Sequence, residues 1–212
     1  MEVSTNQLVG YHSSMVTAKT VQGRRTGRSA ADTQARILAA ATSEFAERGL
    51  AGGRVDRIAT AADANKERIY AYFGSKEGLF DATVWATIGE LLDTVPFDVD
   101  DLPGYAARLY DFTLTHPTLI RLALWYSLER EGSIEQLPQA AESTARKIEA
   151  LTAAQRAGTV DASVPPDRLV PLILGLVHGG LLLAPLPSGP AEVTAQRAAV
   201  RAAVARLVTP SD

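Results

Sequence analysis

Residues 37–79 read ILAAATSEFAERGLAGGRVDRIATAADANKERIYAYFGSKEGL and contain the most regular pattern of this 212-residue chain. Apolar side chains from Ile37 to Phe45 fall on one face of a helix, which Gly49 is expected to end because glycine readily takes a left-handed conformation. Residues 55–62 carry apolar side chains at i, i+3, i+4 and i+7, as a short second helix does. A third short helix is expected from residue 65 to residue 73. The spacing predicts two short helices joined by a tight turn, set on a longer helix.

The residues that flank these helices fit helix ends. Ser29 and Asp32 have the spacing of a capping box before the first helix. Asn65 suits the N-cap of the third helix, and Ser75 suits that of the next helix. Asp63 stands in the turn, where it tolerates the left-handed region better than most residues.

Apolar residues recur at helical spacing throughout the rest of the chain. The segments are separated near Pro96, at His116-Pro117, near Gly132 and Gly158, and by the proline-containing stretch 185–190. No alternating pattern bounded by turns indicates a strand. The fold class is therefore expected to be all-α.

Composition excludes several kinds of chemistry. The chain has no cysteine, which removes disulfides, thiolate metal sites and cysteine nucleophiles. Its three histidines are isolated from one another, so we expect no metal and no cofactor. The nearly apolar stretch 169–186 contains prolines and glycines, so a buried or interface helix is favoured over a membrane span. No secretory signal is evident, and a cytoplasmic location is expected.

Charge is unevenly distributed along the chain. Residues 19–77 hold 11 basic and 7 acidic side chains, a net charge of +4, whereas residues 78–212 carry −6. With −1 from Glu2, the whole chain has a net charge of −3. A basic segment before an acidic one fits local binding of phosphates. Residues 1–28 are polar and lack periodicity, so they are interpreted as a disordered arm with a basic end at Arg24, Arg25 and Arg28.

The third helix supplies side chains suited to nucleic acid. Lys66, Arg68 and Tyr70 lie outside the face that Ile69 and Phe73 use for packing, and such groups contact phosphates and base edges. Ala71 is small enough to let the backbone approach a groove. Tyr72 and Phe73 are expected to pack in the core.

Together, these motifs closely resemble the DNA-binding domain of the tetracycline-repressor (TetR) family. The resemblance covers about 48 residues and several fixed spacings. It implies a helix-turn-helix domain at residues 29–76 and an effector-binding and dimerisation domain at 77–212. It also implies a homodimer that binds a double-stranded, palindromic DNA operator and a small effector. Gly53-Arg54 and Asp63 depart from the family pattern, which usually has a Thr or Ser cap and a Gly turn.

Positions carried over from the family define an expected DNA interface. Lys66 and Arg68 would reach bases or phosphates, and Tyr70 and Lys76 would reach phosphates, the latter helped by its helix N-terminus. Glu67 either accepts from a cytosine amine or limits non-specific binding. The full expected set is Arg24, Arg25, Arg28, Arg54, Val55, Asn65, Lys66, Glu67, Arg68, Tyr70, Ala71 and Lys76.

Two further surfaces are expected behind this domain. An effector pocket with apolar walls and a few polar groups is predicted from Trp85, Tyr105, Phe112, Trp125, Tyr126 and His178, although each is also compatible with an ordinary core. Small residues that allow close helix approach predict a dimer interface from Leu172, Gly175, Leu176, Gly179, Val193, Val200 and Val204.

The predicted function is a transcriptional regulator, in the first instance a repressor that an effector releases from DNA; an activator would have the same sequence features. A helical scaffold with a non-functional DNA-binding domain is the alternative. An enzyme is not expected, because the chain has no phosphate loop, metal spacing or recognisable Ser-His-Asp context.

Overall fold

The computed structural model describes residues 29–130, 137–183 and 187–210, and within these ranges all regular structure is helical. The expected basic arm, with Arg24, Arg25 and Arg28, lies outside the described residues. The helices are α2 (Ala30–Gly52), α3 (Val55–Ala61), α4 (Lys66–Phe73), α5 (Lys76–Thr94), α6 (Leu102–Thr115), α7 (Pro117–Glu129), α8 (Pro138–Arg156), α9 (Pro166–Leu183) and α10 (Pro190–Val208). The all-α expectation is confirmed.

Local sequence signals fix where several of the helices begin. Ser29 and Asp32 form the expected capping box, in which the Asp32 amide donates to Ser29 Oγ at 3.0 Å. The side chains of Asn65 and Ser75 cap α4 and α5 by accepting from the Arg68 and Gly78 amides. Pro166 occupies the first position of α9, where its missing N–H costs little.

The prediction that Gly49 interrupts the first helix in a positive-φ conformation is confirmed, but a short helical segment that was not predicted follows it. Gly49 does leave the helical conformation, with φ +69° and ψ −175°, but helical structure resumes and α2 reaches Gly52. The site is a kink, and it brings the amides of Leu50 and Ala51 to the carboxylate of Glu129 on α7. The helical residues after Gly49 are thus held in part by a side chain of a distant helix, α7.

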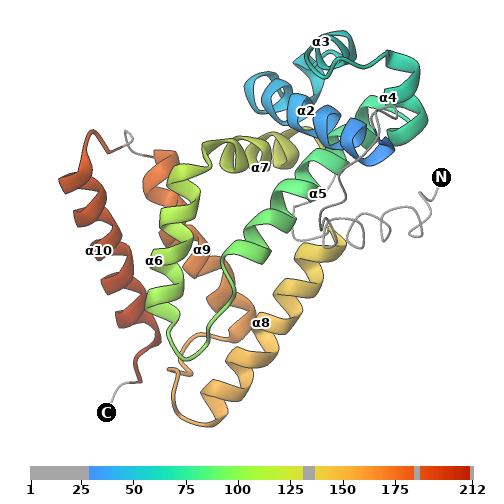
Figure 1. The fold of residues 1–212 in the computed structure, drawn as a ribbon. Coiled ribbons are helices and arrows are strands. Elements are labelled where there is room, and N and C mark those ends of the chain that lie inside the picture. Colours follow the sequence, from blue (N-terminus) through green and yellow to red (C-terminus); the bar gives the residue numbers. More distant parts are fainter. Residues whose placement is uncertain (1–28, 131–136, 184–186, 211–212) are drawn as a thin grey trace, which may run out of the picture.

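The helices form two hydrophobic clusters, which adjoin along α5 and α7. The head, α2 to α4, shares the first cluster with α5, α7 and the start of α8. The second cluster, in the body, is built mainly by α6, α9 and α10 around Leu109, Tyr110 and Val204. Helix α5 runs from the head into the body (Figure 1).

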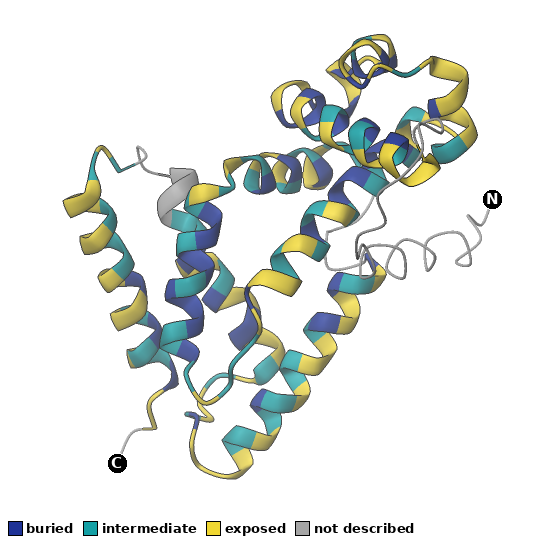
Figure 2. Ribbon diagram, viewed as in Figure 1, coloured by how far each residue is buried: buried dark blue, intermediate teal, exposed yellow. Residues whose placement is uncertain are grey.

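Burial is uneven among the body helices. Buried residues concentrate where α6 faces α9 and α10, whereas the outer side of α10 is exposed (Figure 2). Helix α8 is held more lightly, since only Ala140, Ser143 and Leu151 of its 19 residues are buried. In the described part of the chain, no helix is long and apolar enough to cross a membrane.

Candidate nucleic-acid interface

Helix α4 presents most of its surface to solvent. Of its eight residues only Ile69 is fully buried, and Tyr72 and Phe73 are half-buried against the head cluster, as expected. Its remaining side chains are exposed, and they are Lys66, Glu67, Arg68, Tyr70 and Ala71. Tyr70 is 42% exposed, which is unusual for a large aromatic residue on a short helix. Packing therefore leaves the predicted contact residues accessible on one short helix.

The turn between α3 and α4 is held by both backbone and side chains. Asp63 adopts φ +47°, the one positive φ at a non-glycine residue in the described chain. The Ala64 amide donates to the Ala59 carbonyl at 2.9 Å, and Arg36 of α2 lies 3.6 Å from the Asp63 carboxylate. Aspartate thus fills the position that glycine usually takes in this turn.

Lys66 is paired within the head. Its ammonium lies 2.5 Å from the carboxylate of Asp56 on α3, and this hydrogen bond raises the pKa of Lys66. Both side chains are largely exposed, so the pair contributes little to stability. Lys66 can therefore exchange Asp56 for another anion at small cost.

Helix α3 is positioned by a buried carboxylate. Glu44 of α2 is 8% exposed and accepts from Arg57 Nε at 2.8 and 3.0 Å. It also accepts from the backbone amide of Arg54 at 2.9 Å, and Arg48 lies 3.5 Å away. The hydrogen bond from Arg57 lowers the pKa of Glu44 despite its burial. Glu44 thus orders the start of α3 and is the anion that Arg57 and Arg48 share.

Two residues expected near DNA have other contacts. Val55 is 7% exposed and belongs to the head cluster, so its assignment as a DNA-contacting residue is corrected. The ammonium of Lys76 lies 3.3 Å from the Gly53 carbonyl and 3.5 Å from that of Ala51. Lys76 therefore closes the turn between α2 and α3, whereas Arg54 remains exposed at the start of α3.

Helix α7 connects the head to the body. Glu129 accepts hydrogen bonds from the backbone amides of Leu50 and Ala51, the latter at 3.0 Å. The indole of Trp125 donates to the Ala46 carbonyl at 3.4 Å and packs where a side chain on Gly49 would stand, 2.7 Å from it. This joint explains why the kink at Gly49 requires glycine.

The expected effector residues do not form one site. Trp125 and Tyr126 belong to the head cluster, where Tyr126 stacks on Phe80 at 6.0 Å. Phe112 is buried in the body cluster with its ring 3.9 Å from that of His116. Trp125 and Tyr126 therefore pack in one cluster and Phe112 in the other, because α7 pairs mainly with α2, whereas α6 pairs with α9 and α10.

The other three expected effector residues have different surroundings. Trp85 is half-buried on α5 and does not line the cavity described below. His178 of α9 has a buried Nε2 without a hydrogen-bond partner in the described chain, and burial lowers its pKa to about 4. Tyr105 is 4% exposed and lines a small cavity together with Lys147, which the sequence analysis missed.

The expected dimer residues divide between a surface and a core. Leu172 and Leu176 are 47% and 39% exposed on α9, and Gly175 lies between them on the same face. Val200 and Val204 are buried in the protomer's own body cluster against α6, so their assignment to the interface is corrected. Val193 also packs against that cluster, and Gly179 is half-buried.

An exposed helix carrying basic and phenolic groups, locked by a turn to a second helix, defines the class of helix-turn-helix DNA-binding proteins. Comparison with known proteins agrees. Residues 37–83 match the model for bacterial regulatory proteins of the tetR family, and residues 101–208 match a tetracyclin repressor-like C-terminal domain.

One curated relative and one solved structure each cover most of the chain. The HTH-type transcriptional repressor SCO4008 of Streptomyces coelicolor is 36% identical over 184 residues, covering 83% of this chain and 95% of that protein. The repressor NicS of Pseudomonas putida is 33% identical over 112 residues, 48% of this chain and 53% of its own. A crystal structure of SCO4942 from Streptomyces coelicolor superposes with a TM-score of 0.73 at 37% identity, over 83% of this chain and 98% of that one. The chain belongs to the TetR family of transcriptional regulators.

Proposed function

We propose that the chain is a homodimeric repressor that binds a palindromic DNA operator through α4 and leaves it when a small effector binds the body. The observation that carries this proposal is the surface of α4, which keeps Lys66, Arg68 and Tyr70 exposed on a helix with one fully buried residue. Glu67, Asn65 and Ala71 share this surface. The basic side chains fit the charge of the major groove, and Tyr70 fits a phosphate.

Exposed apolar residues on α9 support the dimer. Leu172 and Leu176 lie one turn apart, and the intervening Gly175 allows a partner helix to approach closely. The outer face of α10 carries mainly small residues, among them Ala195, Ala198 and Ala202, which suit close helix packing. A second copy of the chain would cover both surfaces and fix the spacing of the two heads. Two heads so fixed would match half-sites about 34–36 Å apart or a multiple of that distance.

The joint at α7 gives the effector a route to the head. Trp125 and Glu129 contact backbone groups of α2, so a shift of α7 would carry α2 with it. An effector that favours a body conformation with a different position of α7 would change the head spacing and lower operator affinity.

The test is fluorescence anisotropy with DNA from beside the protein's own gene, at several salt concentrations. We expect tight binding that weakens steeply with salt. The double variant Lys66→Ala/Tyr70→Ala should lose affinity, whereas Arg146→Ala, an exposed residue of α8, should not. Binding to neither the gene-proximal DNA nor random duplex at low salt would refute DNA recognition.

The dimer has its own test. Leu172→Glu should shift the sedimentation of the protein toward the monomer, because a charge would be buried against the partner helix. The matched control is Leu128→Glu on α7, where the leucine is 76% exposed. Equal sedimentation of both variants and the wild type would refute the proposed interface.

A further inference from the structure

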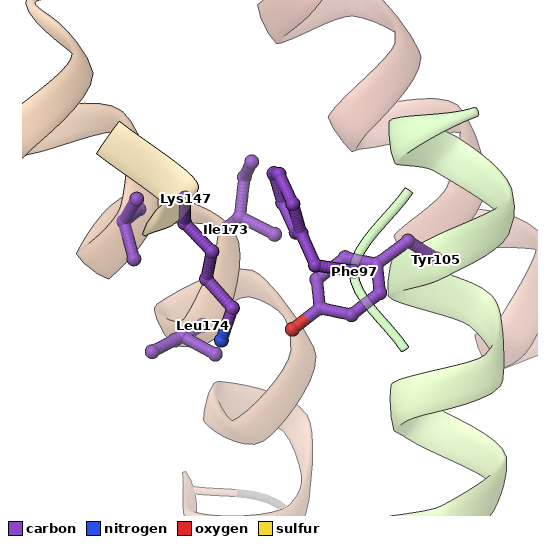
Figure 3. Close-up of a pocket in the computed structure, with 6 residues that line it drawn as sticks. Phe97, Tyr105, Lys147, Ile173 and Leu174 are labelled. Atoms are coloured by element: carbon purple, nitrogen blue, oxygen red, sulfur yellow. The ribbon is translucent and has the colours of Figure 1, made fainter. Parts of the chain in front are cut away.

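One cavity in the body combines a cation, a phenol and apolar walls. It lies between α6, α8 and α9 and has a volume of about 10 Å³, and it is lined by Phe97, Tyr105, Lys147, Val170, Ile173 and Leu174 (Figure 3). It has room for about one water molecule, so a larger ligand would have to displace one of its walls. The ammonium of Lys147 and the hydroxyl of Tyr105 point toward one another across it (Figure 3).

Lys147 brings a positive charge to this cavity, and no residue of the described chain pairs with it as an anion. Its ammonium lies 5.9 Å from the ring centroids of both Phe97 and Tyr105, a cation–π arrangement. No carboxylate of the described chain lies within 4.0 Å of it, and the neighbouring Arg146 is exposed and paired with Glu142 at 2.7 Å. Burial lowers the pKa of Lys147, and the charge of Arg146 lowers it further.

Tyr105 adds a hydrogen-bond donor. Burial raises its pKa to about 12, so the phenol keeps its proton at neutral pH. No hydrogen bond joins this hydroxyl to another described residue, and its oxygen is not completely buried. It is therefore available to a molecule that enters the cavity. Val170, Ile173 and Leu174 offer that molecule an apolar wall.

Helix α8 is the wall that can move to admit a ligand. None of the residues from 144 to 150, which include Lys147, is fully buried. Few buried contacts hold this stretch in place, so displacing it costs less free energy than displacing α6 or α9. The buried Nε2 of His178, one turn beyond Leu174 on α9, offers a further polar group on that side.

We propose that this cavity is the effector site and that it takes an organic anion with a flat apolar body, such as an aromatic carboxylate. The carboxylate accepts from Lys147 and Tyr105, and the ring packs against Ile173 and Leu174. A cationic ligand would meet like charge without a compensating acid, so the site selects against it. This inference rests on the proposed function, because it assigns the ligand class of the regulator's body.

The test compares three probes of one shape: 2-naphthoate, its neutral amide and its cationic amidine. Isothermal titration with the full-length protein should show the anion binding at least about tenfold more tightly than either analogue, as expected for a charge-assisted hydrogen bond. Lys147→Met should remove that preference, and Lys147→Arg, which keeps the charge, should retain it. The matched control is Arg146→Gln, the neighbouring exposed cation, which should bind within about twofold of the wild type.

Equal affinity for the three probes, no binding of any, or an unchanged preference in Lys147→Met would overturn the assignment. Operator binding without a probe is measured separately, by anisotropy. A protein that binds its operator yet shows no anion preference would refute only the ligand class. A protein that prefers the anion but never binds DNA would refute the proposed function instead.

Discussion

The carboxylate of Glu44 should be the most important charge for the stability of the DNA-binding head. It is 8% exposed and accepts from the guanidinium of Arg57 and the backbone amide of Arg54. Glu44→Gln keeps the shape of the side chain but removes its charge, and it places an amide donor near the donors of Arg57. The start of α3 would then lose its strongest anchor.

The size of this loss in stability follows from how far Glu44 and Arg57 are each buried. Removing one member of a fully buried ion pair costs about 3–5 kcal/mol. The side chain of Arg57 is 40% exposed and can be hydrated when its partner is neutral. We therefore expect Glu44→Gln to lower the free energy of unfolding by about 2 kcal/mol at pH 7.

Urea unfolding followed by circular dichroism, at one protein concentration, measures this loss. Glu47→Gln is the matched control, because Glu47 lies on the same helix and pairs with Arg48 while 60% exposed. That control should cost less than about 1 kcal/mol.

The loss should also depend on pH. Arg57 lowers the pKa of Glu44 in the folded state. The contribution of Glu44 to the free energy of unfolding is therefore complete above its ordinary pKa of 4.5. That contribution is lost as pH falls through the lower folded-state pKa. The difference between the wild type and Glu44→Gln should therefore narrow in acid. Equal costs for Glu44→Gln and Glu47→Gln at pH 7, or a difference that grows on acidification, would refute this account.

Three further perturbations follow from the joint and the body. Gly49→Ala should lower the free energy of unfolding by about 3 kcal/mol or more, because a φ of +69° is strained for alanine and the new Cβ would stand 2.7 Å from Trp125. Its control, Gly74→Ala, has φ +76° but open space around it and should lower that free energy by only about 1 kcal/mol in urea unfolding. Glu129→Ala should cost about 1–3 kcal/mol in the same assay, since the buried Leu50 amide loses its acceptor; an unchanged midpoint would contradict that contact. Burial lowers the pKa of His178 to about 4, against its ordinary value of 6.5, so the wild type should lose stability as pH falls from 6.5 towards 4. In thermal unfolding scans, the midpoint of His178→Asn should fall less between about pH 6.5 and about pH 5 than that of the wild type.

The sequence alone determined the helical segments and where capped helices begin, because these depend on local chemistry; the stretch of α2 after Gly49 was not predictable in this way. Apolar spacing marked the helical faces, and Ser29, Asn65 and Ser75 capped the helices they precede. The exposed surface of α4 was also predictable, since Ile69 and Phe73 fix which face of a two-turn helix packs. A short element leaves little freedom in the choice of its outer face.

Only the tertiary structure decided how the body is used, because helix pairing cannot be read from the periodicity of one helix. Apolar residues such as Val204 and Leu172 have the same local pattern. Val204 of α10 is nevertheless buried against α6, whereas Leu172 of α9 is exposed. Trp125 likewise packs on a kink 76 residues earlier in the chain, at Gly49. Lys147 looks like an ordinary surface lysine until α6 and α9 place Tyr105 and Leu174 beside it. Such long-range contacts depend on which faces meet, and that is set by the packing of the whole chain.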